Sequence, residues 1–211
     1  MKYDQHFLED EKVAKKIVSF LDARKNEKIL EIGPGQGVLT QFLKGNVTLI
    51  EIDKDLFEEL RIRFPGFKVI NNSILKYNGN FDKIISNVPY SICEPLMNKL
   101  VKMNFKKAIL MFPETFMEKG VLNLIMNHFF NVNELLKINK NSFYPVPRVD
   151  SKILEIIPRR LNEKEVVLRN IYLQSDKKLK NVFESDLSFK DKKIYRMNFN
   201  EWQELLNKLF P

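Results

Sequence analysis

The sequence predicts an α/β fold, a mainly parallel sheet covered on both faces, with a small helical domain at its C-terminal end. Short apolar strand patterns alternate with helix patterns from about residue 28 to 138, and this alternation is typical of parallel sheets whose strands are joined by helices. The last 50 or so residues instead contain short Lys-rich helix patterns, too few for an independent core. We therefore expect one domain over residues 1–160 and a second, helical one over 161–211.

The elements of the first domain follow from apolar spacing. An amphipathic helix is expected over residues 10–21, with Val13, Ile17 and Leu21 on one face. Asp53 is placed to cap the helix that follows the second strand. The pattern predicts helices over 38–43, 54–64 and 94–103 and one ending near 130, and strands over 28–32, 47–52, 67–71, 81–86, 108–112, 135–138 and 153–157.

Composition excludes several classes of protein. No apolar stretch is long enough to cross a bilayer, and the polar start does not resemble a signal peptide. The single cysteine, Cys93, excludes an internal disulfide framework and fits a reducing cytoplasm. The two histidines, His6 and His128, lie far apart without neighbours at ligand spacing, so we expect no metal site.

The positive charge is concentrated near the C-terminus. Residues 137–211 carry 16 Lys and Arg against 10 Asp and Glu, within a chain of net charge +8. Such a surface suggests a polyanionic partner, although Lys-rich helix faces are often simply solvated.

A glycine-rich loop, residues 33–37, lies between a predicted strand and a predicted helix. Its glycines let the backbone approach a ligand closely, and Glu51, at the end of the next strand, can accept both hydroxyls of a ribose. Pro34 removes an amide that a pyrophosphate would need, so the loop favours S-adenosylmethionine over NAD. Glu51 can alternatively be a solvated strand-end carboxylate, and Glu31 a structural acceptor for backbone amides.

The tetrapeptide of residues 87–90, Asn-Val-Pro-Tyr, follows another apolar run. Pro89 makes the backbone extended and stiff, so carbonyls can point into a cleft. Asn87 adds a side-chain acceptor and Tyr90 a ring that can stack on a base. The segment can therefore hold a flat base, although alone it can also be a structural turn after a strand.

Five short motifs occur in order, at residues 5–8, 31–35, 51–53, 87–90 and 143–151. Together they resemble the ribosomal RNA adenine dimethyltransferases of the KsgA type, over about residues 3–158. The resemblance implies a Rossmann-like S-adenosylmethionine-dependent methyltransferase fold that acts in ribosome biogenesis. The expected reaction transfers methyl groups to the exocyclic amines of two adjacent adenosines in small-subunit rRNA.

The resemblance also implies roles for individual residues. Tyr90 and Phe143 would stack on either side of the target base, although Phe143 can instead be a core residue in a proline-rich turn. The catalytic group it implies is Asn87, Val88, Pro89, Tyr90 and Phe143, and the cofactor contacts are His6, Leu8, Gly33, Gly35, Glu51, Ser73 and Asn87.

The chain departs from the family pattern in four places. His6 stands where the family usually has Asn, and residues 112–115 are altered. Ser73 stands where an Asp normally receives the amino group of the cofactor's adenine, which predicts weaker cofactor binding. The basic N-terminal extension is missing and the tail is short, which predicts weaker RNA binding.

RNA contacts are expected from basic side chains, which bind phosphates and give affinity with strong salt dependence. The partner would be small-subunit rRNA or a pre-ribosomal particle, bound by a monomer. The predicted RNA-binding residues are Arg148, Arg159, Arg160, Lys177, Lys178 and Lys180.

Two other functions remain open from the sequence. One is methylation of large-subunit rRNA, as in the antibiotic-resistance enzymes, which tend to have Asn where Asp150 stands. The other is a ribosome-assembly factor that binds RNA without catalysis, which Ser73 and the short ends would suit.

Overall fold

The computed structural model describes residues 6–211 and divides the chain into two compact units. The first unit is Met1–Phe116 with Asn131–Pro158, and the second is Met117–Phe130 with Arg159–Pro211. The second unit therefore includes a helix from the middle of the chain in addition to the predicted tail. Gln5, part of the first motif, lies outside the described residues.

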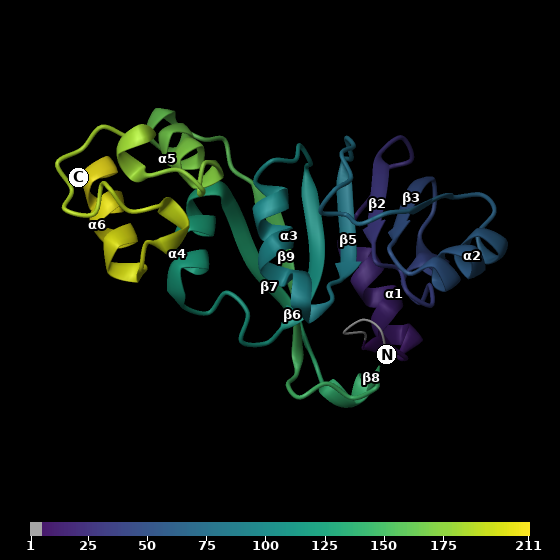
Figure 1. The fold of residues 1–211 in the computed structure, drawn as a ribbon. Helices are drawn as coiled ribbons and strands as arrows, with labels where there is room; N and C mark the ends of the chain where they lie inside the picture. Colours follow the sequence, from purple (N-terminus) through teal and green to yellow (C-terminus); the bar gives the residue numbers. More distant parts are fainter. Residues whose placement is uncertain (1–5) are drawn as a thin grey trace. The chain divides into compact units, whose positions relative to one another are not determined.

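The first unit is built on a seven-stranded sheet with the order β4-β3-β2-β5-β6-β9-β7 (Figure 1). Strands β2 to β6 run parallel to their neighbours, and β9 runs antiparallel to β6, which confirms the predicted mainly parallel sheet. The strands are β2 Lys28–Ile32, β3 Asn46–Glu51, β4 Lys68–Asn71, β5 Lys83–Asn87, β6 Lys107–Pro113, β7 Phe130–Ile138 and β9 Ser151–Pro158.

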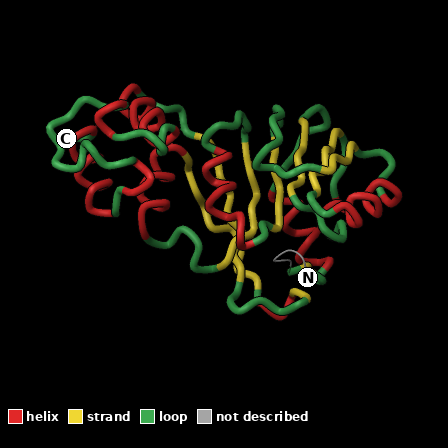
Figure 2. Tube along the Cα trace, in the orientation of Figure 1, coloured by secondary structure: helices red, strands yellow, loops and turns green. Residues whose placement is uncertain are grey.

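In the described part of the first unit, one α-helix precedes the sheet, two join its strands, and three short 3₁₀ helices lie in the loops (Figure 2). Asp53 caps α2 as predicted, since its carboxylate accepts from two backbone amides at the start of the helix. The helices are α1 Glu11–Phe20, α2 Lys54–Arg63, α3 Cys93–Leu100, η1 Thr40–Phe42, η2 Tyr90–Ile92 and η3 Lys140–Ser142.

The prediction of a helix over residues 38–43 is wrong, because only the 3₁₀ turn of η1 forms there. Six residues make less than two helical turns, so local propensity has little weight. The Thr40 hydroxyl instead bonds the buried Glu31 carboxylate at 2.7 Å, which ties this segment to β2.

Both faces of the sheet are buried. On one face, residues from α1, α2 and the strands form a single apolar cluster that includes Ala14, Ile17, Ile29, Leu49, Leu60 and Ile85. Side chains alternate along a strand, and the alternate residues Leu30, Ile50 and Ile84 are also fully buried. This rigid sheet fixes the positions of the loops at its edges.

A second, two-stranded sheet was not predicted. Strand β1, Phe7–Leu8, pairs antiparallel with β8, Phe143–Tyr144, with Phe7 opposite Tyr144 and Leu8 opposite Phe143. The amide of Glu9 extends the pairing by donating to the Ser142 carbonyl at 2.9 Å. In Figure 1, β8 lies beside the N-terminal end of the described chain.

The second unit is a small helical domain, as predicted for the C-terminal end. Helix α4, Gly120–Phe129, packs against α5, Glu163–Leu173, and α6, Phe199–Leu209. The short helices η4, Leu179–Asn181, and η5, Ile194–Arg196, lie between α5 and α6 in the chain. The centroids of the Tyr172 and Trp202 rings lie 6.2 Å apart. Capping boxes at Asn162 and Asn198 stabilise the starts of α5 and α6.

Candidate functional site

A cavity of ≈ 160 Å³ lies in the first unit, where the carboxyl ends of the parallel strands meet. Ligands of open α/β sheets bind at this edge, because the loops that follow the strands converge there. Residues from six segments line it: 6–8, 31–36, 38–39, 50–52, 72–74 and 87–92. The glycine loop and the tetrapeptide of residues 87–90 therefore line the same cavity.

The glycine loop has the conformation that requires glycine. Gly33, Gly35 and Gly37 have φ values of +58°, +56° and +78°, a region in which L-residues are strained. A Cβ atom on Gly35 would lie 2.9 Å from the Phe7 ring, whereas one on Gly33 would meet nothing within 4 Å. Backbone and ring thus close one side of the cavity, and the space beside Gly33 stays open to a ligand.

Glu51 is held at the end of β3 by two backbone donors. Its Oε2 accepts from the Gly35 amide at 3.1 Å and its Oε1 from the Asp53 amide at 2.9 Å. Burial raises the pKa of this carboxyl, and the two amides oppose that rise. Each oxygen keeps a second lone pair, so the oriented carboxylate can accept hydroxyl donors from a ligand in the cavity.

Glu31 lies at the floor of the cavity and is almost fully buried. Loss of solvent raises the pKa of its carboxyl to about 8, the Thr40 hydroxyl opposes the rise, and the nearby Glu51 carboxylate adds to it. Glu31 is therefore largely protonated near neutral pH, so Glu51 is the carboxylate of the pair that can accept hydrogen bonds from a ligand.

Asn87 is oriented by the backbone of the N-terminal segment. Its Nδ2 donates to the His6 carbonyl at 2.8 Å, which fixes the direction of the amide because a carbonyl only accepts. Among residues 6–211 no donor bonds the Asn87 Oδ1, so this oxygen is available to a ligand. The His6 Nδ1 in turn lies 2.7 Å from the Pro145 carbonyl and must carry the proton of that bond.

The segment after Asn87 is fixed on several sides. The Val88 amide donates to the Met111 carbonyl of β6 at 3.1 Å, and Pro89 is extended, with ψ of 131°, as predicted. The centroids of the Tyr90 and His6 rings lie 5.4 Å apart, with an angle of 41° between the ring planes. The Tyr90 hydroxyl lies 3.2 Å from Ser151 Oγ. An acceptor, a stiff backbone and an aromatic ring are therefore presented together to the cavity.

Sequence comparison decides the family. The profile described as ribosomal RNA adenine dimethylase matches residues 1–208. A protein of Borreliella afzelii named ribosomal RNA small subunit methyltransferase A is 33% identical over 223 residues, which cover 93% of this chain and 79% of that one. A protein of Pyrococcus furiosus named probable ribosomal RNA small subunit methyltransferase A is also 33% identical, over 81% of this chain and 68% of that one.

The chain belongs to the ribosomal RNA adenine dimethylase family. Membership confirms the predicted fold class, the predicted activity of an rRNA adenine dimethyltransferase acting on the small subunit, and the predicted cofactor, S-adenosylmethionine.

Solved structures agree on the fold. A dimethyladenosine transferase of Plasmodium falciparum superposes with a TM-score of 0.70 at 24% identity, over 96% of this chain and 97% of that one. The 23S rRNA methyltransferase ErmE superposes with a TM-score of 0.69 at 20% identity, over 97% and 100%. At these identities the likeness shows the fold alone and does not distinguish the two ribosomal subunits.

Phe143, which the sequence allows either to stack on the base or to lie in the core, does not line the cavity in this structure. Its side chain is 3% exposed and packs in the apolar cluster of the first unit. Alternation along β8 is the reason, since Phe143 points inward and Tyr144 is 65% exposed. The other predicted contacts in the first unit, His6, Leu8, Gly33, Gly35, Glu51, Ser73, Asn87, Val88, Pro89 and Tyr90, all line the cavity.

Ser73 lies at the cavity wall with part of its hydrogen-bonding capacity already used. Its Oγ accepts from the Leu75 amide at 3.3 Å, as in a serine turn. Sequence reasoning missed three of its neighbours in the lining, Ile52, Asn72 and Ile74. Ile52 follows the end of β3 and is 49% exposed, and an apolar residue just beyond a buried strand was the available signal.

The predicted RNA-binding residues differ in how free their charges are. Arg148 and Arg160 are exposed. Arg159 instead bonds the carbonyls of Asn127 and His128 at the end of α4, at 2.8 and 3.3 Å, and pairs with the buried Glu165 at 3.1 Å.

The three predicted lysines also have partners within the second unit. Lys180 and Lys178 pair with Asp191 at 2.6 and 3.6 Å, and Lys177 bonds Gln174 at 2.8 Å. The charges of Lys178 and Lys180 are therefore partly balanced by Asp191, which reduces the field that they offer to a phosphate.

Two further observations concern residues 6–211. No group of three or more His, Cys, Asp or Glu side chains in this part of the chain could hold a metal ion. No helix within it is long and apolar enough to cross a membrane.

Proposed function

We propose that the cavity of the first unit binds S-adenosylmethionine beside an adenosine extruded from small-subunit rRNA, and that residues 87–90 hold the amine that is methylated. The observation that carries this proposal is the shared cavity of the glycine loop and residues 87–90. Catalysis by methyl transfer needs the donor and the acceptor atom in one enclosed geometry.

The residues present fit the cofactor. The positive φ of Gly35 and the Phe7 ring beside it leave a backbone surface that a nucleoside can approach closely. Glu51, fixed by two amides, would accept the ribose hydroxyls. The cofactor, when bound, supplies a methyl group made electrophilic by the adjacent sulfonium.

Asn87 and Val88 act on the amine. The lone pair of an adenine amine is delocalised into the ring, and acceptors for its two hydrogens favour the pyramidal, more nucleophilic form. Asn87 Oδ1 is oriented for this by the bond from its Nδ2 to the His6 carbonyl, and the Val88 carbonyl would be the second acceptor. This is electrostatic stabilisation of charge that develops in the transition state.

Tyr90 would bind the extruded base. Stacking of a base on an aromatic ring is worth about 1–3 kcal/mol, which offsets much of the few kcal/mol needed to remove a base from its neighbours. Phe143 would have to leave the buried cluster to stack on the other side, so the proposal assigns base stacking to Tyr90 alone.

No general base is part of the proposal. The alkylated amine is acidic and can lose its proton to water, so methyl transfer needs no carboxylate at the amine. Orientation and electrostatics by Asn87, Val88 and Tyr90 are sufficient.

The rival functions predict different results. A large-subunit enzyme would have the same fold, as ErmE illustrates, but the relatives of 30% identity or more named above are small-subunit enzymes. A non-catalytic assembly factor would have no need for the oriented Asn87 amide or for glycines at positive φ in the loop. These observations favour retained chemistry.

Methyl transfer from labelled S-adenosylmethionine to isolated ribosomal subunits tests the proposal, followed by mapping of the methylated nucleotides. We expect label on two adjacent adenosines of small-subunit rRNA. Label confined to large-subunit rRNA, or no label on either subunit, would contradict it. The choice between naked rRNA and a pre-ribosomal particle, the monomeric state and the cytoplasmic location stay predictions.

A further inference from the structure

Exposed side chains occur at alternate positions from the last residue of β8 onward. Burial alternates there, with Phe143 and Pro147 buried and Tyr144, Val146 and Arg148 exposed. Tyr144 is 65% exposed and Val146 is 53% exposed. An aromatic ring, an aliphatic side chain and a cation on this short segment are therefore each exposed to solvent.

Tyr144, the first of these residues, lies next to a residue of the cavity wall. Tyr144 is the direct cross-strand partner of Phe7, and the side chains of such a pair project from the same face of the two strands. Phe7 lines the cavity and contacts Gly35. The ring of Tyr144 therefore continues, toward solvent, the wall that Phe7 begins.

The backbone that carries Tyr144 is fixed on both sides. The Ser142 carbonyl accepts from the Glu9 amide at 2.9 Å, and the Pro145 carbonyl accepts from His6 Nδ1 at 2.7 Å. A ring held in position on a rigid segment loses little entropy when a ligand stacks on it.

We propose that Tyr144 stacks on the base of the nucleotide next to the target adenosine, and that Arg148 contacts the phosphate of the same stretch of RNA. The inference rests on the proposed function. A base extruded into the cavity leaves its neighbour outside, at the rim and without a stacking partner. An exposed ring and a cation four residues further along the chain can bind the base and the phosphate of such an unpaired stretch.

The test uses an RNA hairpin whose loop carries the two target adenosines and a fluorescent 2-aminopurine directly beside them. Stacking quenches 2-aminopurine, so wild-type protein and Tyr144→Phe should quench it at saturation, and Tyr144→Ala should not. In methyl-transfer assays Tyr144→Ala should raise the KM for the RNA about tenfold, with little change in kcat.

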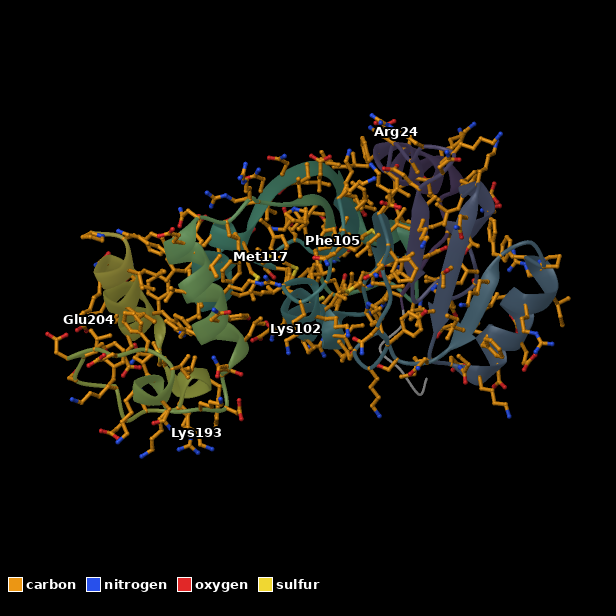
Figure 3. The ribbon with its side chains drawn as sticks, turned by 90° about the horizontal axis from the view of Figure 1, so that it is seen from above. Arg24, Lys102, Phe105, Met117, Lys193 and Glu204 are labelled. Carbon is orange, nitrogen blue, oxygen red and sulfur yellow. The ribbon has the colours of Figure 1, made fainter. Side chains whose placement is uncertain are left out.

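Two controls separate stacking from other roles. Tyr195→Ala removes a ring that is 57% exposed in the second unit, beside Lys193 and Arg196, and should leave quenching unchanged. Figure 3 shows Lys193 on an outward-facing part of that unit. Calorimetry should give Tyr144→Ala the wild-type affinity for S-adenosylhomocysteine, and its melting temperature should be unchanged because the ring is exposed.

Wild-type quenching and KM in Tyr144→Ala would overturn this inference, while methyl transfer by the wild-type protein would leave the proposed function standing. Loss of cofactor affinity in Tyr144→Ala would also overturn it, since the ring would then cover the cofactor. If wild-type protein transfers no methyl group to small-subunit rRNA, both proposals fail.

Discussion

Polar groups are treated differently in the cavity of the first unit and on the basic surface of the second. In the cavity, Asn87 and Glu51 are held by backbone groups and keep lone pairs for a ligand. In the second unit, Lys180 forms an ion pair with Asp191, and Arg159 forms one with Glu165. Oriented groups with unused hydrogen-bonding capacity indicate a site that binds a ligand. The number of charged residues in a sequence, by contrast, does not show whether their charges are available to a partner.

The largest effect is expected at Asn87. Asn87→Ala removes the oriented acceptor and should lower kcat about 10²–10³-fold, as losses of comparable transition-state contacts do. Methyl transfer to small-subunit rRNA under single-turnover conditions measures it. Asn46→Ala, an exposed Asn at the opposite end of β3, is the matched control and should keep wild-type turnover. Near-normal turnover in Asn87→Ala would remove this residue from the site.

The acidic floor of the cavity predicts an unusual pH dependence of stability. Because the pKa of Glu31 is raised to about 8 in the folded protein, the folded state binds this proton more tightly than the unfolded state. Stability is therefore full below the unfolded pKa near 4.5 and falls as the pH rises toward 8. Glu31→Gln keeps an acceptor for Thr40 and removes this fall, which is on the order of 3 kcal/mol between pH 5 and 8.

Urea unfolding without cofactor at several pH values measures the effect as the difference between wild type and Glu31→Gln. Parallel curves for the two proteins would mean that Glu31 does not carry the proton.

Arg159 and Arg160, adjacent in the second unit, allow a paired arginine to be compared with an exposed one. Arg159→Ala should lower the free energy of unfolding by roughly 2 kcal/mol, because the buried Glu165 loses its partner. Arg160→Ala should leave stability unchanged and reduce the salt slope of RNA binding by about one. Thermal unfolding and binding at several salt concentrations separate them. Equal effects of the two substitutions on both measurements would contradict the assignment.

The smallest effect is expected at Ser73. Ser73→Asp can keep the bond to the Leu75 amide and adds a charged acceptor at the cavity wall, which should raise cofactor affinity about fivefold. Isothermal titration measures it, and Ser73→Asn is the control for size without charge. No gain for Asp over Asn would count against a contact between Ser73 and the cofactor's adenine.

Much of the cavity was predictable because its signals are local. A glycine loop after a strand, an acidic residue at the next strand end and a proline-stiffened tetrapeptide each have a physical meaning within a few residues. The parallel strands that bring them together follow from apolar runs bounded by helices. Gly35, Glu51 and Asn87 could therefore be placed at one edge from sequence.

The remaining features depend on contacts between distant segments. The two-residue strands β1 and β8 carry no periodicity, so their pairing, and with it the burial of Phe143 and the exposure of Tyr144, could not be read from sequence. The partners of Arg159 on α4 were equally invisible. Short strands and ion pairs need the tertiary fold to define them.

A crystal structure of the protein with S-adenosylhomocysteine tests the central claim most directly. We expect the ligand to fill the cavity, with its ribose hydroxyls on Glu51 and its sulfur facing Asn87. A ligand bound outside the cavity, or one whose sulfur faces away from residues 87–90, would contradict it.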